Sequence, residues 1–156
     1  METNEKLAEV LNDLLEINND RIKGYNKAAD EVKDSDLDLK AIFKNMANES
    51  VKYTSELTQL VQRLGANPST GTTVRGKIYR VWMDVKATFI GHDRQSVLES
   101  CEFGEDAAQR AYTDALASDA EISAEIRKII TDQQAALKKS HNLIRKYRDM
   151  HKAVNA

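Results

Sequence analysis

The 156-residue sequence has few of the residues that interrupt helices or crosslink chains. It contains one proline, six glycines and one cysteine, Cys101. A lone cysteine excludes an internal disulfide and fits a reducing compartment. Because Cys101 falls on an apolar stripe, we interpret it as a small core residue rather than a nucleophile. The scarcity of proline, together with 31% charged residues, is typical of long helices rather than of sheets.

The sequence also lacks a long apolar run and a large excess of one charge. No stretch approaches the roughly 20 apolar residues that span a bilayer. The beginning METNEKLAEV lacks the basic start and apolar segment of a signal peptide. A formal net charge of −2 gives no overall attraction to nucleic acid. We therefore expect a cytoplasmic protein with no membrane span and no nucleic-acid partner.

Apolar residues at three- and four-residue spacing are abundant, and this is the pattern of amphipathic helices. Gly65, followed by Pro68, predicts the end of one helix, and Ser118 with Glu121 has the spacing of a capping box that opens another. The length suits a single domain over residues 1–156. The expected helices cover residues 3–33, 36–64, 74–90, 93–117 and 119–153.

The connections between these helices predict how they pack. The first two long helices are joined by a short turn, as are the last two, so each pair forms an antiparallel hairpin. The hairpins are joined by roughly thirty residues that include the short helix 74–90, enough to run the length of the bundle. We therefore expect an all-α four-helix bundle in which a long crossover joins two antiparallel hairpins.

A polar residue interrupts the apolar stripe near the middle of each long helix. These residues are Asn18, Glu49, Glu105 and Gln133. A buried unpaired carboxylate costs several kcal/mol, so polar residues at one depth predict a shared polar site. Two interpretations stay open, namely a structural hydrogen-bond network that fixes the helix register and a site for a ligand or metal.

Tyrosines lie on the same stripes, one in each long helix, and we expect them to pack in the core with their hydroxyls bonded to polar partners. They are Tyr25, Tyr53, Tyr112 and Tyr147.

The segment RGKIYRVWMDVK (75–86) is basic on one side and apolar on the other. Either its apolar side packs on the bundle while its charges face water, or it contacts a partner. An exposed Trp82 beside Tyr79 would indicate an interface, and a homodimer is one form that it could take.

The layout and three segments resemble a known family. The segments are NNDRIKGYNKAAD (18–30), RGKIYRVWMDVK (75–86) and CEFGEDAAQRAY (101–112). They are similar to a bacterial family of ferritin-like four-helix bundles that carries only the label of a domain of unknown function. The resemblance covers nearly the whole chain and extends distantly to the rubrerythrin and ferritin superfamily, whose members oxidise or store iron. It implies a ferritin-like bundle.

The superfamily's di-iron site takes a Glu from each of two helices and a Glu-x-x-His from each of the other two. Carried over to this sequence, the pattern keeps Glu49 and Glu105 alone. The remaining ligand positions hold Asn18, Lys52, Gln133 and Ala136. No Glu-x-x-His occurs in the sequence, and its three histidines are expected on the surface.

The resemblance thus implies a degenerate di-iron site, in which Lys52 takes the place of the metal cation and pairs with Glu49 and Glu105. The favoured hypothesis is a non-enzymatic binding or structural module without a cofactor, acting on an unknown protein or small-molecule partner. One alternative is a metal-binding or iron-oxidising protein that uses Glu49 and Glu105, with Asp20 and Asp106 as substitute ligands for di-iron or another divalent metal. The other is a homo-oligomeric interaction protein that associates through the crossover helix.

Overall fold

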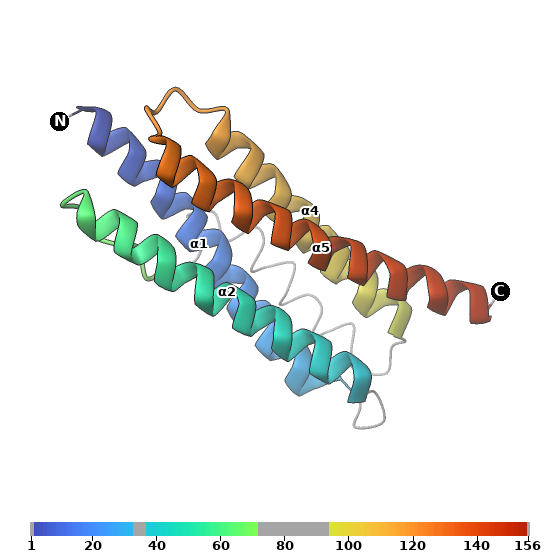
Figure 1. The fold of residues 1–156 in the computed structure, drawn as a ribbon. Coiled ribbons are helices and arrows are strands. Elements are labelled where there is room, and N and C mark those ends of the chain that lie inside the picture. The colour runs from blue at the N-terminus through green and yellow to red at the C-terminus, as the bar shows by residue number, and fades with distance from the viewer. Residues whose placement is uncertain (1, 33–36, 72–93, 156) are drawn as a thin grey trace.

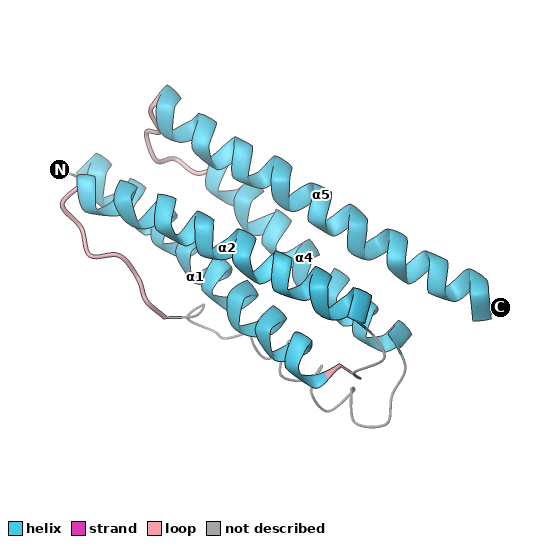
Figure 2. Cartoon of the chain, turned by 60° about the horizontal axis from the view of Figure 1, so that its bottom comes forward, coloured by secondary structure: helices cyan, strands magenta, loops and turns pink. Residues whose placement is uncertain are grey.

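The computed structural model describes residues 2–32, 37–71 and 94–155. Its helices are α1 (Glu2–Glu31), α2 (Leu37–Arg63), α4 (Arg94–Leu116) and α5 (Ala124–Asn155). The described residues contain no strand (Figure 2), so the predicted all-α four-helix class is confirmed. The expected helix 74–90, with Tyr79 and Trp82, lies outside the described residues.

The end of α2 follows from one glycine. Gly65 adopts a φ of +78°, the left-handed region that favours glycine. Its amide donates to the Gln62 carbonyl at 2.9 Å, and the Ala66 amide donates to the Val61 carbonyl at 3.2 Å. These two bonds form a Schellman motif, which satisfies carbonyls at the end of the helix. The predicted helix end at Gly65 is therefore confirmed.

The start of the last helix differs from the expectation. The helix begins at Ala124 rather than 119, because Ser123 is the N-cap and its Oγ accepts a hydrogen bond from the Ile126 amide at 3.2 Å. Ser118, expected to open a capping box with Glu121, instead donates its hydroxyl to the Ala115 carbonyl at 2.8 Å. Ser118 thus belongs to the end of α4, and the residues between the two serines form a longer connection.

The helix directions follow from contacts at one end of the bundle. Arg63, the last residue of α2, pairs with Glu125 in the first turn of α5 at 3.4 Å. Since α4 leads directly into α5, α2 and α4 both end there and run in the same direction (Figure 1). Their neighbours α1 and α5 run the opposite way. In the described part of the chain, α1 contacts α2 and α4, α5 contacts α4 and α2, and α1 and α5 are diagonal.

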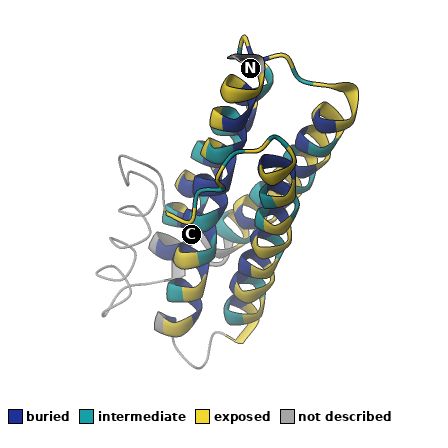
Figure 3. Ribbon diagram, turned by 90° about the vertical axis from the view of Figure 1, so that its left-hand side faces the viewer, coloured by how far each residue is buried: buried dark blue, intermediate teal, exposed yellow. Residues whose placement is uncertain are grey.

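Figure 3 shows that buried residues alternate with exposed ones along each helix, and the buried apolar residues form two clusters. One cluster, around Tyr25, Phe43 and Leu98, lies toward the end where α1 finishes and α2 and α4 begin. The other, around Leu11, Leu57 and Ile130, lies toward the opposite end. Polar side chains lie between them, at mid-height of the bundle. None of the helices described here has a segment long and apolar enough to traverse a lipid bilayer.

Candidate functional site

The candidate site is the layer of polar side chains between the two apolar clusters. Asn18 and Arg21 come from α1, Ser50 from α2, Glu105 from α4 and Gln133 from α5. Each of them is at most 2% exposed. They occupy inward positions because they continue the alternating three- and four-residue spacing of the core residues on each helix. All four described helices therefore contribute polar groups at one depth.

The centre of this layer is the guanidinium of Arg21. Its Nε donates to Glu105 Oε1 at 2.7 Å, its Nη1 donates to Ser50 Oγ at 2.5 Å, and its Nη2 lies 3.4 Å from Glu49 Oε1. The Tyr25 hydroxyl donates to the same Glu105 oxygen at 2.9 Å. The guanidinium carbon also lies 5.3 Å from the centre of the Tyr25 ring, within cation–π range. The buried cation is therefore held by both carboxylates and by an aromatic face.

A chain of neutral hydrogen bonds continues from Ser50 toward the other apolar cluster. Ser50 donates to Asn18 Oδ1 at 2.8 Å, and Asn18 Nδ2 donates to the Tyr112 hydroxyl at 2.8 Å. Tyr112 donates in turn to Gln133 Oε1 at 2.7 Å. The Gln133 amide donates to Glu56 Oε1 at 3.0 Å. We call the residues joined by these bonds and those of Arg21 the central network.

Burial and charge act together on the titratable groups of the network. Burial alone would lower the pKa of Arg21, but Glu105 and other neighbours raise the pKa above its ordinary value, so the guanidinium keeps its charge. Burial raises the pKa of the Tyr25 hydroxyl, and the Glu105 carboxylate raises it further. The pKa of the Cys101 thiol is raised for the same two reasons. A neutral thiol is unreactive, as a core role for Cys101 requires.

Lys52 does not hold the position that was expected of it. Its side chain is exposed on α2, whereas Arg21 provides the buried cation beside Glu49 and Glu105. Glu49 is itself at the edge of the layer, with 25% of its side chain exposed, and it accepts a second hydrogen bond from Ser140 at 2.9 Å. The expected pairing of Lys52 with the two glutamates is therefore wrong.

The four tyrosines differ in depth. Tyr25, Tyr53 and Tyr112 are buried, and Tyr147 is half-buried against the apolar cluster around Phe43. Burial raises the pKa of Tyr53 and of Tyr112 above the ordinary value. Tyr25 and Tyr112 use their hydroxyls within the central network.

The two aspartates considered as substitute metal ligands do not join Glu49 and Glu105 in a metal-binding cluster within the described residues. Asp106 pairs with His141 Nε2 at 2.5 Å on the outer side of α4 and α5, and Asp20 is buried on α1. Within residues 2–32, 37–71 and 94–155, no three His, Cys, Asp or Glu side chains cluster so as to hold a metal ion. The Arg21 guanidinium lies between the two glutamates, so the residues present do not fit a di-iron centre.

Sequence reasoning missed Arg21, Ser50 and Ser140. The signal that identifies Arg21 is its spacing, since it follows Asn18 by three residues and precedes Tyr25 by four. Strict alternation of these intervals places Arg21 in the inward row, although the apolar Ile22 beside it is the more obvious core candidate by residue type. Ile22 is only half-buried. An unbroken heptad count would have found the arginine.

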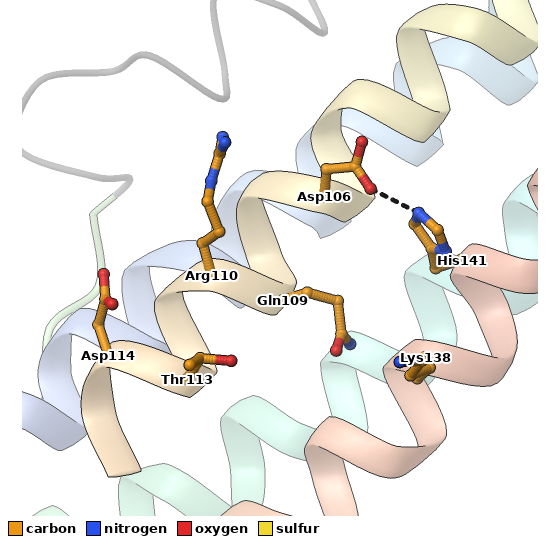
Figure 4. Close-up of a pocket in the computed structure, with 7 residues that line it drawn as sticks. All are labelled: Asp106, Gln109, Arg110, Thr113, Asp114, Lys138 and His141. Atoms are coloured by element: carbon orange, nitrogen blue, oxygen red, sulfur yellow. Dashed lines mark hydrogen bonds and ion pairs between the residues drawn. The ribbon is translucent and has the colours of Figure 1, made fainter. Parts of the chain in front are cut away.

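A surface groove of about 350 Å³ lies between α4 and α5, outside the central network (Figure 4). Asp106 and His141 meet across it, while Gln109 extends from α4 toward Lys138 on α5. Gln109 donates to the Gln134 carbonyl at 3.1 Å. The polar side chains that line this groove therefore link α4 to α5 in the second hairpin.

Comparison with known proteins gives one family. The family described as a domain of unknown function (DUF2383) matches residues 6–118, more than two-thirds of the chain. This match includes Asn18, Arg21, Glu49 and Glu105 and ends before α5. The chain matches no curated protein sequence.

Proposed function

The chain belongs to this family of unknown function, and from that premise we propose that it is a ferritin-like bundle acting as a binding or structural module rather than as a metal enzyme. The shared direction of α2 and α4 supports the ferritin-like part, since that topology needs a long crossover between them. The observation that carries the functional part is the buried guanidinium of Arg21 between Glu49 and Glu105.

The guanidinium supplies the positive charge that the two carboxylates need. A metal ion entering this space would bring a second cation next to Arg21, and the two would repel each other in a medium of low dielectric. The neighbouring amides of Asn18 and Gln133 are neutral, so they add no charge to balance that cation. The central network therefore serves to join the two hairpins in one register, and recognition falls to the outer surface. The predicted cytoplasmic location and homodimer stay predictions.

Anaerobic titration with Fe(II), followed by exposure to oxygen, tests this proposal. We expect no stoichiometric iron and no oxo-bridge absorption, with Glu105→Gln behaving like the unmodified chain in this assay. Glu125→Gln, on the surface, is the matched control. Near-stoichiometric iron that is lost in Glu105→Gln but kept in Glu125→Gln would overturn the proposal and establish the iron-handling alternative.

A further inference from the structure

The outer side of α5 is rich in unpaired cations between residues 138 and 150. Lys138, Lys139, Arg145 and Lys146 are all exposed, and none has an ion pair or hydrogen-bond partner within the described residues. We call these four residues the basic face. The one acidic residue between positions 138 and 150 is Asp149, which accepts a hydrogen bond from Arg148 at 2.9 Å. The face therefore carries a local excess of positive charge, although the whole chain has a net charge of −2 and Lys138 also lines the α4–α5 groove together with Asp106 and Asp114.

Two aliphatic side chains are exposed on the same stretch. Leu143 is 37% exposed and Met150 is 53% exposed. They are seven residues apart, so they lie on one side of the helix, about 10 Å from each other. A shallow hollow of about 400 Å³ lies on this stretch, on the side of Met150, and its lining is Asn142, Arg145, Lys146, Asp149 and Met150. Cations, aliphatic groups and a concave surface thus occur together.

We propose that the basic face binds an acidic amphipathic helix of a partner protein. Carboxylates of that helix would pair with the free ammonium and guanidinium groups, and its aliphatic side chains would pack between Leu143 and Met150. The spacing suits a helix lying alongside α5, since heptad positions of two helices meet at this interval. This inference rests on the proposed role as a binding module, and it names the partner's chemistry.

The observations favour a helix over a membrane. A helix that lies on a lipid surface presents its apolar side to the acyl chains. The apolar side of α5 is occupied instead, because Ile130, Leu137 and Ile144 are fully buried in the bundle. Leu143 and Met150 alone leave too little apolar surface for stable insertion.

Nucleic acid is disfavoured by the kinds of side chain on the surface. Its recognition needs cations that follow a phosphate backbone, without a requirement for exposed aliphatic groups. Single-stranded forms also use exposed aromatic rings for stacking. Here the exposed groups between the cations are Leu143 and Met150, and the aromatic Tyr147 is packed against the core.

A second copy of the chain is disfavoured by geometry. Among the described residues, an exposed acidic stripe that could serve as the counterpart is formed by Glu5, Glu9 and Asp13 on α1. Because α1 and α5 are diagonal in the bundle, the two surfaces face opposite directions. Pairing between copies would be head to tail and would not close into a dimer.

Fluorescence anisotropy with a labelled helical peptide of about five turns, built from glutamate, alanine and a leucine stripe, tests the proposal. We expect binding that weakens with added salt. Lys146→Glu should reduce affinity by about fivefold to tenfold and Leu143→Ser by about threefold to fivefold. Lys44→Glu and Val51→Ser are matched controls, because both residues are exposed on α2 and Lys44 faces Asp30 of α1. The controls should leave affinity unchanged.

The binding of three further probes is compared with that of the helical peptide. These are a scrambled peptide of the same composition, duplex DNA, and vesicles of phosphatidylglycerol. Equal binding of the scrambled peptide, or tighter binding of DNA or vesicles than of the helix, would overturn the inference. So would the absence of peptide binding, or salt-sensitive self-association that Lys146→Glu abolishes. The iron titration tests the central network alone, so either proposal can fail without the other.

Discussion

Two ion pairs of nearly equal length differ in how far their side chains are exposed to water. Arg21 Nε lies 2.7 Å from Glu105 Oε1, and both side chains are fully buried. Lys6 Nζ lies 2.8 Å from Asp119 Oδ2, with exposed fractions of 53% and 82%. Water already solvates the second pair, whereas the first pair has only protein groups to replace its hydration. The distance alone therefore does not indicate what breaking a pair costs.

Removal of the buried cation should have the largest effect. Arg21→Met keeps the length of the side chain but leaves Glu105 buried without its charged partner. We expect the free energy of unfolding to fall by about 3–5 kcal/mol. Urea unfolding followed by circular dichroism measures this change.

The double variant Arg21→Met, Glu105→Leu is the control for that measurement. It removes both charges, so it should recover most of the stability lost in Arg21→Met. If the double variant were as unstable as the single one, the loss would come from packing and hydrogen bonds of Arg21 rather than from the uncompensated carboxylate.

Raising the pH should act on the same buried layer. The pKa values of Tyr25 and Tyr112 are raised in the folded state, chiefly by burial, whereas in the unfolded chain they titrate near 10. Stability is therefore retained below pH 10 and lost as the pH rises above it, by about 1.4 kcal/mol for each tyrosine at pH 11. Absorbance of tyrosinate, recorded together with circular dichroism, should show both residues ionising only as the chain unfolds. Ionisation of both in a folded chain would contradict this.

A smaller loss is expected at the neutral end of the central network. Tyr112→Phe removes the hydroxyl that joins Asn18 to Gln133 and leaves a buried donor and acceptor short of one partner. We expect a loss of about 1–2 kcal/mol in chemical unfolding. Tyr147→Phe is the matched control, because the half-buried Tyr147 donates no hydrogen bond within the described residues. An equal loss in both variants would show that the bonds of Tyr112 contribute little.

The exposed pair should give the smallest effect. The pKa of Lys6 is raised and that of Asp119 is lowered, mainly by the hydrogen bond between them. Both groups are well solvated, so Lys6→Ala should leave the unfolding midpoint close to that of the unmodified chain, and added salt should remove any difference. A midpoint shift as large as that of Tyr112→Phe would reverse the comparison between the two pairs.

The sequence predicted the helices better than it predicted their polar contacts. Apolar spacing and Gly65 define where α2 lies and ends, because periodicity and backbone conformation are local properties. The start of α5 was missed because Ser118 and Ser123 can both act as caps, and tertiary packing decides between them. Asn18, Glu105 and Gln133 were recognised because each interrupts an apolar row.

The identity of the buried cation could not be read from local preference. Lys52 follows Glu49 by three residues, so the two face nearly the same way on an isolated helix. In the bundle that side of α2 is at the edge, where an ammonium is better solvated by water. Arg21 suits the interior because its planar guanidinium can bond several partners at once. The choice depends on the rotation of α2 against three other helices.

The mutual dependence of Arg21 and Glu105 has a consequence for how such a sequence can change over time. Replacing either residue first leaves an uncompensated charge in the interior, and conversion to a metal-binding layer would also require new ligands at Asn18 and Gln133. Each single step toward that layer passes through a less stable protein, whereas substitutions on the outer side of α5 leave the interior intact. The buried pair of Arg21 and Glu105 can therefore be exchanged for uncharged residues without a large loss of stability only when both change together.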